Sequence, residues 1–339
     1  MVTIKEIAER AGVSTTTVSN VIHHNTKKVS PENIEKINKL IQEMGYIQRK
    51  GFNVLRNDKS QLIAVVVNSH KTYEESLLAD PFYGEIIGFI ESRLREAGYY
   101  MMFYSASDID DIFHMIMTWD VDGVIAITFS ATNCEKLRHF VDKPIIAIDS
   151  HCQPSVSSSV PDIGIDNRQG GYIMTKHLLQ KGYENILVCA CKDYGNDHMR
   201  WAGVQDAWRE CNYPTQKKLQ LDIIGTTWEY RKQYYRELSK HIPFKNKTVA
   251  FFMSDYFALE AIGYLTSKGF KIPDDLGIAG FDDLVYSTRW TSPALTTIKQ
   301  DIRKKAELAV DEMVKMINDS EYEPKTIVLP TTLIERDSV

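Results

Sequence analysis

The sequence predicts an α/β protein in which a small all-helical N-terminal domain precedes a larger domain of two doubly wound lobes. Apolar residues recur at helical spacing through residues 1–46. Short continuous apolar runs alternate with amphipathic stretches through residues 61–339, a pattern typical of parallel sheets with helices on both faces. This second region is too long for one hydrophobic core, so we expect it to form two lobes.

The first predicted helix begins at a capping box. The Thr3 hydroxyl can accept a hydrogen bond from one backbone N–H, and the Glu6 side chain can reach back to another. Gly12 follows at the place where a left-handed residue ends a helix. The apolar residues between them recur at spacings of three and four and are Ile4, Ile7, Ala8 and Ala11. This pattern predicts a short helix with one buried face.

A second short helix follows after a turn of only two residues, Gly12 and Val13. Ser14 is its expected cap, and the apolar residues expected to face the first helix are Val18, Val21 and Ile22. Two short helices joined so tightly cross at a steep angle, which is the helix-turn-helix arrangement.

The third predicted helix begins after Ser30, a good cap, with Pro31 in its first position and Glu32 to complement the helix dipole. Gly45 ends it. Its expected buried stripe consists of Ile34, Ile37, Leu40, Ile41 and Met44. The three helices together can bury one small core.

The second helix also has a polar face, made of Thr15, Thr16, Ser19 and Asn20. Such short side chains can hydrogen-bond base edges and phosphates in a DNA major groove. A solvated face with no partner is the alternative, and the pattern alone leaves both open.

Charge is distributed unevenly along the chain. Residues 1–60 carry a net charge of +4, whereas the remainder carries −9 and the whole chain −5. The basic end can therefore approach phosphate groups while the rest stays acidic. Part of the positive charge lies in residues 47–60, whose composition alone favours a flexible linker.

The larger domain shows strand and helix signals in alternation. The apolar runs expected as buried strands are 62–67, 121–127, 144–149, 185–190, 248–253 and 277–281. The stretches expected as amphipathic helices include 82–97, 167–181, 198–210, 227–240, 256–268 and 301–318.

Ligands of such sheets bind at the carboxyl ends of the strands. The polar and aromatic residues that follow the apolar runs are Phe82, Tyr83, Asp149, Arg200, Ser254, Asp255, Asp282 and Asp283. Carboxylates, one arginine and aromatic rings could hydrogen-bond a polyol and cover its apolar face. Each carboxylate alone could equally cap the next helix, so this pattern leaves both interpretations open.

Several other classes of protein lack support. The sequence contains no G-x-S-x-G, no P-loop and no G-x-G-x-x-G after a strand, and the neighbouring Asp282 and Asp283 diverge too far to act as a paired acid and base. Cys189 and Cys191 with His198 do not have a standard zinc spacing. We therefore expect no enzymatic activity, no cofactor and no metal.

The compartment follows from composition. The five cysteines are scattered and odd in number, which suits reduced thiols. The first residues do not form a secretory signal, and no apolar run is long enough to span a membrane. We expect a cytoplasmic protein with no membrane partner.

Two segments of the N-terminal domain resemble the LacI/GalR family of regulators. These are TIKEIAERAGVSTTTVSNVI and KVSPENIEKINKLIQEMGY. In the larger domain IDNRQGGYIMTKHLLQKGYENI, MSDYFALEAIGYL, IPDDLGIAGFDD and SPALTTIKQD are similar to further family signatures, in the same order. The resemblance thus covers essentially the whole chain. It implies a helix-turn-helix head and a periplasmic-binding-protein-like clamshell of two doubly wound lobes.

The resemblance implies that the head binds double-stranded DNA. The residues assigned to DNA binding are Thr3, Ser14, Thr15, Thr16, Thr17, Ser19, Asn20 and Leu55. Leu55 is the expected minor-groove wedge of a hinge helix, although Gly51, Asn53 and Val54 are poor helix formers. Many relatives have arginine in place of Asn20, so the preferred base pair should differ there.

The resemblance also implies an effector site between the lobes. The residues assigned to it are Phe82, Tyr83, Asp149, Arg200, Trp228, Ser254 and Asp282, with Ile302 as a further candidate. Ser254 and Ile302 differ from residues common in relatives, which leaves the identity of the ligand open. Trp228 could stack on a sugar face or belong to the core.

The expected protein is a homodimeric repressor of a carbohydrate-utilisation operon that binds a near-palindromic operator and a small-molecule effector, a sugar. Alternatives are a purine effector, a phosphorylated partner protein and, less favoured, a carbohydrate-processing enzyme. The expected domains are the head at 1–46, a hinge at 47–60 and the effector-binding and dimerisation domain at 61–339. Its N-terminal lobe is expected at about 61–160 and 292–320, and its C-terminal lobe at about 161–291 and 321–339.

Overall fold

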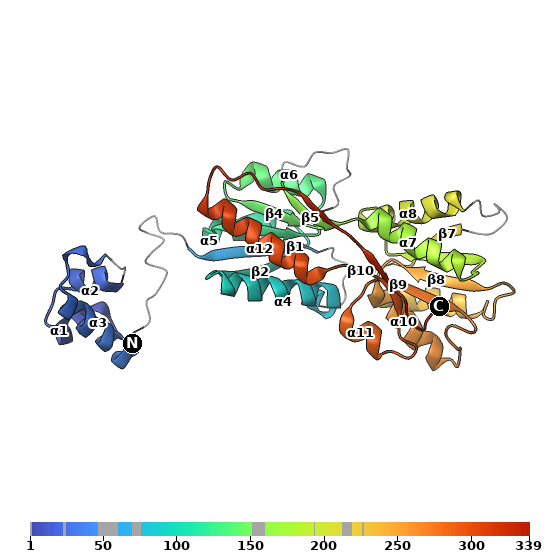
Figure 1. The fold of residues 1–339 in the computed structure, drawn as a ribbon, viewed down its shortest axis with the longest axis horizontal. Coiled ribbons are helices and arrows are strands. Elements are labelled where there is room, and N and C mark those ends of the chain that lie inside the picture. The colour runs from blue at the N-terminus through green and yellow to red at the C-terminus, as the bar shows by residue number, and fades with distance from the viewer. Residues whose placement is uncertain are drawn as a thin grey trace. The chain divides into compact units, whose positions relative to one another are not determined.

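The computed structural model describes residues 2–22, 25–46, 60–69, 76–150, 160–192, 194–211, 219–225 and 227–339. By its internal contacts the chain divides into two units, Met1–Ser60 and Gln61–Val339. The predicted hinge residues 47–59, including Leu55, lie outside the described residues. Figure 1 shows both units.

The described residues of the first unit form three α-helices, as the sequence predicts, and one 3-10 turn. They are α1 (Ile4–Ala11), α2 (Thr15–Ile22), the 3-10 turn η1 (Thr26–Lys28) and α3 (Pro31–Met44). The capping box is confirmed, because Thr3 N donates to Glu6 Oε2 over 2.7 Å and Glu6 N donates to Thr3 Oγ1 over 3.3 Å. Gly12 and Gly45 end α1 and α3 with positive φ angles of 70° and 63°. The shared core consists of Ile7, Ala8, Ala11, Val18, Val21 and Ile37.

The N-terminal lobe of the second unit is built on a parallel six-stranded sheet of order β11-β5-β4-β3-β1-β2. Its strands are β1 (Leu62–Asn68), β2 (Tyr100–Ala106), β3 (Gly123–Ile127), β4 (Ile145–Ile148), β5 (Asp162–Ile165) and β11 (Ile327–Leu329). Its helices are η4 (Leu77–Ala79), α4 (Pro81–Glu96), α5 (Ile109–Trp119), α6 (Ala131–Phe140) and α12 (Ile302–Asn318). Apolar side chains of α4 and α12 cover one face of the sheet, and those of α5 and α6 cover the other.

The C-terminal lobe repeats this plan with the sheet order β12-β10-β9-β8-β6-β7, in which only β12 runs antiparallel. Its strands are β6 (Asn185–Ala190), β7 (Leu219–Ile223), β8 (Thr248–Phe252), β9 (Gly277–Asp282), β10 (Thr296–Lys299) and β12 (Thr332–Ile334). Its helices are α7 (Asn167–Gln180), α8 (Asn196–Glu210), α9 (Trp228–Ser239), α10 (Asp255–Ser267) and α11 (Val285–Trp290). Side chains of α7 and α8 cover one face, and those of α9 and α10 the other.

The chain crosses between the lobes three times, later in the sequence than expected. β5 and β11 belong to the N-terminal sheet, whereas β10 and β12 belong to the C-terminal sheet. The crossings therefore follow residues 165, 299 and 329 in place of the expected boundaries near 160, 291 and 320. The last crossing is drawn in dark red in Figure 1. The expected boundaries differ because strands of three or four residues carry no signal of which sheet they join.

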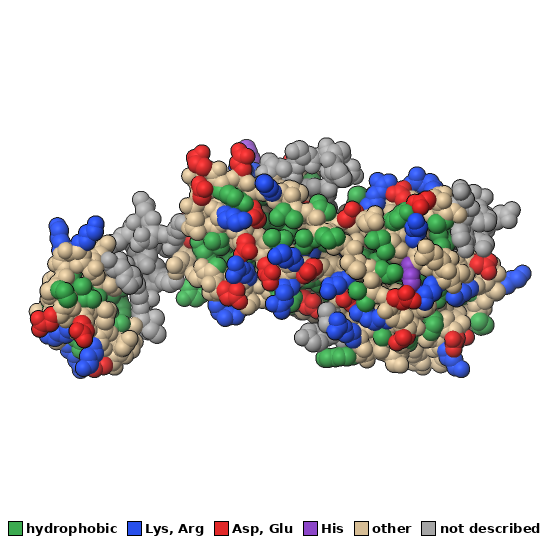
Figure 2. Space-filling view, in the orientation of Figure 1, with side chains coloured by type: hydrophobic (Ala, Val, Ile, Leu, Met, Phe, Trp, Pro, Cys, Tyr) green, Lys and Arg blue, Asp and Glu red, His purple; other side chains and the backbone are tan. Residues whose placement is uncertain are grey.

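The surface of the second unit carries both signs of charge. Figure 2 shows acidic and basic side chains intermingled over its visible face. Among the described residues, no helix has the length and apolar character that a membrane span requires. The four cysteines that the structure describes are free thiols, and the described ranges contain no group of three or more His, Cys, Asp or Glu side chains placed to hold a metal ion.

Candidate functional site

The candidate DNA-reading surface is the polar face of α2. Thr15 and Thr16, in its first turn, are exposed, whereas Ser19 and Asn20 are half-buried. Ser14 caps the helix, because Thr17 N donates to its Oγ over 3.1 Å. The structure thus leaves the first-turn threonine side chains open to a partner.

Two other residues assigned to DNA have different surroundings. The hydroxyl of Thr17 lies 2.9 Å from that of Ser14, within the cap. The hydroxyl of Thr3 is engaged with Glu6 in the capping box that begins α1. A DNA contact by either residue remains a prediction, and the structure gives each of them a role in helix capping.

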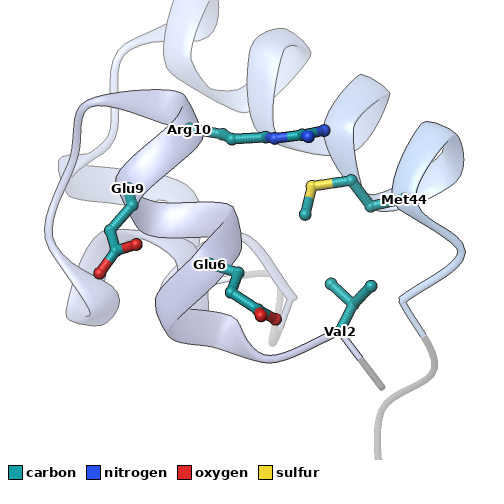
Figure 3. Close-up of a pocket in the computed structure, with 5 residues that line it drawn as sticks. All are labelled: Val2, Glu6, Glu9, Arg10 and Met44. Atoms are coloured by element: carbon teal, nitrogen blue, oxygen red, sulfur yellow. The ribbon is translucent and has the colours of Figure 1, made fainter.

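A shallow hollow of 440 Å³ lies on the head, lined by Val2, Glu6, Glu9, Arg10 and Met44. Figure 3 shows Glu6 and Arg10 pointing toward the space between α1 and the end of α3, where Val2 and Met44 lie. Its lining residues come from α1, α3 and the N-terminus and include none from α2. This hollow therefore belongs to the packing of the head and is separate from the polar face of α2.

In the second unit, four of the residues assigned to the effector gather at the carboxyl ends of the two sheets. Asp149 follows β4 of the N-terminal lobe, and Asp282 ends β9 of the C-terminal lobe. Ser254 caps α10 directly after β8, and Arg200 lies in the first turns of α8. This placement agrees with the rule that ligands of doubly wound sheets bind at these strand ends.

Arg200 is a buried cation with several partners in the C-terminal lobe. Its Nε donates to Asn167 Oδ1 over 2.9 Å, its Nη1 donates to the carbonyl of Met253, and its Nη2 lies 3.6 Å from Asp282 Oδ1. The guanidinium stacks over the Phe281 ring at 3.7 Å from the centroid. These contacts hold the planar fork in one orientation.

The close approach of α7 and α8 sets the position of Arg200. Gly171 of α7 lies against the backbone carbonyl of Arg200, and Gly203 of α8 lies against the backbone carbonyl of Arg168. A Cβ atom at either glycine would come within 2.0 Å of that carbonyl oxygen. The sequence needs glycine at both positions because the two helix backbones are in contact.

Asp282 accepts hydrogen bonds from the cap of α10 and from the crossing segment that follows β10. Ser254 Oγ donates to its Oδ2 over 3.1 Å, and Gln300 Nε2 donates to its Oδ1 over 2.6 Å. Burial raises the pKa of Asp282, while the charge of Arg200 and these donors act in the opposite direction. Asp282 is only 4% exposed, so these partners hold its carboxylate in one position at the end of β9.

Lys305 and Gln300 extend this network into the N-terminal lobe. Lys305 Nζ donates both to Asp149 Oδ2 and to Gln300 Oε1. A continuous polar path, here called the interlobe relay, therefore runs through Asp149, Lys305, Gln300, Asp282 and Arg200. The relay joins the strand ends of both sheets, because Asp149 belongs to one lobe and Asp282 to the other.

Sequence reasoning assigned no role to Lys305 or Gln300. A signal for Lys305 existed, because the lysine falls on the apolar stripe of α12 that contains Ile302, Ala306 and Ala309. A lysine in such a stripe must be paired when it is buried. Gln300 carried a weaker signal, since it follows β10 directly at a strand end.

The aromatic residues assigned to the effector divide into two groups. Phe82 lies next to the relay, with Lys305 Nζ 5.3 Å from its ring centroid, and it packs edge-on against Tyr83. Tyr83 is mostly buried in the core of its lobe, and its hydroxyl lies 3.0 Å from Thr128 Oγ1. Ile302 is likewise a core residue.

Trp228 lies apart from this group. It is partly buried against the apolar cluster of α9 and α10, with its ring 6.4 Å from that of Tyr235. Within the described residues, no contact joins Trp228 to the relay. Its surroundings are those of a residue at the edge of the core.

Further carboxylates surround the relay. Burial raises the pKa of Asp80, the N-cap of α4, to about 6, and the charge of Asp282 contributes to this rise. Burial also raises the pKa of Asp197, in the first turn of α8. These groups make the surroundings of the relay rich in acidic side chains.

Comparison with known proteins places the chain in a family. Residues 3–48 match the family model described as bacterial regulatory proteins, lacI family, and residues 175–339 match the periplasmic binding protein-like domain. The HTH-type transcriptional regulator DegA of Bacillus subtilis is 30% identical over 99% of this chain and 97% of its own length. The HTH-type transcriptional repressor PurR of Histophilus somni is 27% identical over 100% of this chain and 99% of its own.

Among solved structures, the Lac repressor dimer bound to operator and the anti-inducer ONPF has the same fold. The TM-score is 0.82 at 23% identity, covering 99% of this chain and 98% of that one. The matched relatives are transcription regulators and not enzymes. This chain belongs to the lacI family of bacterial regulatory proteins, with a helix-turn-helix head and a periplasmic-binding-protein-like domain.

Proposed function

We propose that the protein is a homodimeric repressor that binds a near-palindromic operator through α2 and is controlled by a sugar bound between the lobes. The exposed first turn of α2 supports the DNA contact, because Thr15 and Thr16 are short hydrogen-bonding side chains at the start of a second helix. A dimer matches a palindrome because both have twofold symmetry.

The interlobe relay is the observation that carries the effector part of this proposal. It holds Asp149, Asp282 and Arg200 at the carboxyl ends of two sheets and connects the lobes through Lys305 and Gln300. A ligand that hydrogen-bonds to these groups would contact both lobes at once. Its binding energy could therefore favour one arrangement of the two lobes over another. Coupling between the effector and DNA requires two such arrangements that differ in their affinity for each.

A purine effector is the second candidate, and the relatives named PurR favour it. The acidic and amide side chains of the relay can bind the N–H and carbonyl groups of a base as well as the hydroxyls of a sugar. Phe82, next to Lys305, could stack on either ring.

Selection of genomic DNA fragments with the full chain, followed by a ligand panel on a selected fragment, tests this proposal. We expect enrichment of a short palindrome, and we expect a neutral sugar to change the affinity for that fragment at least fivefold. A change caused by hypoxanthine and by no sugar would replace the sugar with the purine. Enrichment of no sequence would contradict the DNA-binding part.

A further inference from the structure

We propose that Lys305 is a specificity-determining residue of the cleft: with Asp149 it forms a subsite for a neutral hydroxyl group, so that the cleft selects an uncharged polyhydroxy effector over an anionic one. This inference rests on the proposed function, in which a small effector binds between the lobes. It adds a residue and a charge rule that the proposed function does not contain.

Lys305 occupies an unusual position for a lysine. Its side chain is 0% exposed and lies on the face of α12 that otherwise packs apolar residues such as Ala306 and Ala309. The free-energy cost of removing an ion pair from water often exceeds the attraction between the two charges. Proteins in which apolar residues of similar size replace such a pair are frequently as stable. The pair of Lys305 with Asp149 is therefore poorly explained as a stability device, which points to recognition.

The pair of Lys305 and Asp149 has unused hydrogen-bonding capacity in the described structure. An ammonium group has three donors, and within the described residues Lys305 uses two of them, on Asp149 and Gln300. The other carboxylate oxygen, Asp149 Oδ1, is buried and has no hydrogen-bond partner in the described structure. One donor and one acceptor thus remain within a single ion pair.

A hydroxyl group satisfies both of these atoms. It can accept from Lys305 Nζ and donate to Asp149 Oδ1, whereas a carboxylate or phosphate only accepts and would place negative charge against that oxygen. When a bound ligand leaves a buried acceptor such as Asp149 Oδ1 without a donor, binding loses the free energy of hydration of that acceptor. The pair therefore favours a hydroxyl over an anion at this point.

The other buried cations around the relay already have partners. Arg200 contacts Asn167, Met253 and Asp282. Arg231 is bound by both carboxylate oxygens of Glu260, at 2.6 and 2.8 Å. Each cation has a carboxylate partner.

Further carboxylates lie around the relay, together with Lys192, a cation whose charge acts on Asp197. The charge of Asp282 acts on Asp80, and the charge of Arg200 acts on Asp197. An anionic effector would meet these carboxylates in a region of low dielectric constant, where like charges repel strongly. A neutral ligand avoids this repulsion.

The test uses the full chain and isothermal titration with six probes. These are glucose, ribose, cellobiose, gluconate, glucose 6-phosphate and hypoxanthine. We expect the wild type to bind at least one neutral sugar at least tenfold more tightly than either anion. Lys305→Met should weaken that sugar at least tenfold. Lys304→Met is the matched control, because Lys304 neighbours Lys305 on α12 but has a side chain 52% exposed, and it should bind like the wild type.

Asp149→Asn changes the net charge of the pair with Lys305 from zero to +1. The asparagine keeps an oxygen for Lys305 but removes the negative charge, so we expect the affinity for gluconate or glucose 6-phosphate to rise at least tenfold. The double variant D149N/K305M carries no buried charge at this point, so it should fold even where Lys305→Met does not. It should lose the neutral sugar without gaining the anions.

The outcomes separate the two proposals. Tighter binding of an anion by the wild type, binding of hypoxanthine alone, or an unchanged sugar affinity in both Lys305→Met and the double variant would overturn the inference while leaving a cleft effector in place. Failure of all six probes to bind would overturn the proposed sugar or purine effector and the inference with it.

Discussion

Arg200 is the single residue at which we expect effector sensing to be separable from DNA binding. Arg200→Lys keeps the positive charge near Asp282, but a lysine cannot hold partners in three directions as the guanidinium does. We expect the effector-induced change in operator affinity to fall by about 1–3 kcal/mol, the usual range of allosteric coupling, while operator affinity without effector stays the same. Fluorescence anisotropy with the selected fragment measures both.

Arg209→Lys is the matched control, because Arg209 lies on the same helix with a side chain 72% exposed. It should behave like the wild type in both measurements. Loss of operator binding in Arg200→Lys without effector would contradict this division of labour.

Asn20 is the residue from which we expect a change in base preference. Asparagine pairs well with adenine and arginine with guanine, and a good bidentate pair discriminates by about 1–3 kcal/mol. Asn20→Arg should therefore shift one symmetric base pair of the selected operator from A·T to G·C. Parallel selections with the two proteins measure this, and identical enriched sequences would exclude a base contact by Asn20.

Asp255 makes stability depend on pH. Burial raises its pKa to about 8, while Thr297 Oγ1 and Leu284 N donate to its carboxylate. An unfolded aspartate titrates near pH 4, so between about pH 4 and 8 the folded protein holds a proton that the unfolded chain has lost. The free energy of unfolding should therefore fall as pH rises through this window.

Asp255→Asn removes this titration, so its free energy of unfolding should fall less between pH 5 and pH 8 than that of the wild type. Urea unfolding at the two pH values gives the comparison. Asp274→Asn, at an exposed aspartate of the same lobe, should follow the wild type. An equal pH dependence in Asp255→Asn and the wild type would show that the Asp255 carboxylate is ionised in the folded state.

At the residue scale the sequence predicted several members of the relay and missed its connections. Arg200, Asp149 and Asp282 follow apolar runs, so the strand-end rule found them. Lys305 and Gln300 connect Asp149 and Asp282, which follow strands of different sheets. No local sequence pattern predicts that these two strand ends lie close together. An effector contact by Trp228 stays a prediction, and the described contacts of its ring are with Tyr235 and the apolar cluster of α9 and α10.

At the scale of elements, the α7–α8 contact is the most sensitive packing feature of the C-terminal lobe. A Cβ at Gly203 would lie 1.8 Å from the carbonyl oxygen of Arg168, so Gly203→Ala must push α8 away from α7. We expect a loss of about 1–3 kcal/mol in the free energy of unfolding. The effector response should weaken as well, since Arg200 moves with α8. Urea unfolding and anisotropy measure the two effects.

Gly263→Ala, in α10, is the matched control. A Cβ at Gly263 meets no other atom within 4 Å, so alanine should stabilise the helix by about 0.4–1 kcal/mol. A Gly203→Ala variant as stable as Gly263→Ala would show that the helices can separate without cost.

Long, buried strands were predicted more accurately than short ones. β1, β6 and β8 lie at or within two residues of the predicted ranges, because a strand buried on both faces is one apolar run. β2 is an edge strand with no fully buried residue, and it was not among the predicted strands although its sequence is almost entirely apolar and aromatic. β11 and β12 have three residues each, too few for a periodic signal.

At the scale of the whole molecule, the division after residue 60 was visible in the sequence. The periodicity of the apolar residues changes there and so does the sign of the net charge, and the contacts divide the chain at the same place. The division of the larger unit into lobes followed from its length, but the three crossing points depend on strand pairing between distant segments. Such pairing is a property of the folded sheets and leaves no local trace.

We expect residues 1–60 to make this chain a sequence-specific DNA-binding protein. An anisotropy titration of the full chain with its selected palindrome and with a scrambled duplex of equal length, at physiological salt, tests this expectation. We expect the palindrome to bind at least 10³-fold more tightly, the lower end for specific recognition. Residues 61–339 alone should fold and bind neither duplex. Equal affinity of the full chain for both duplexes would contradict the claim.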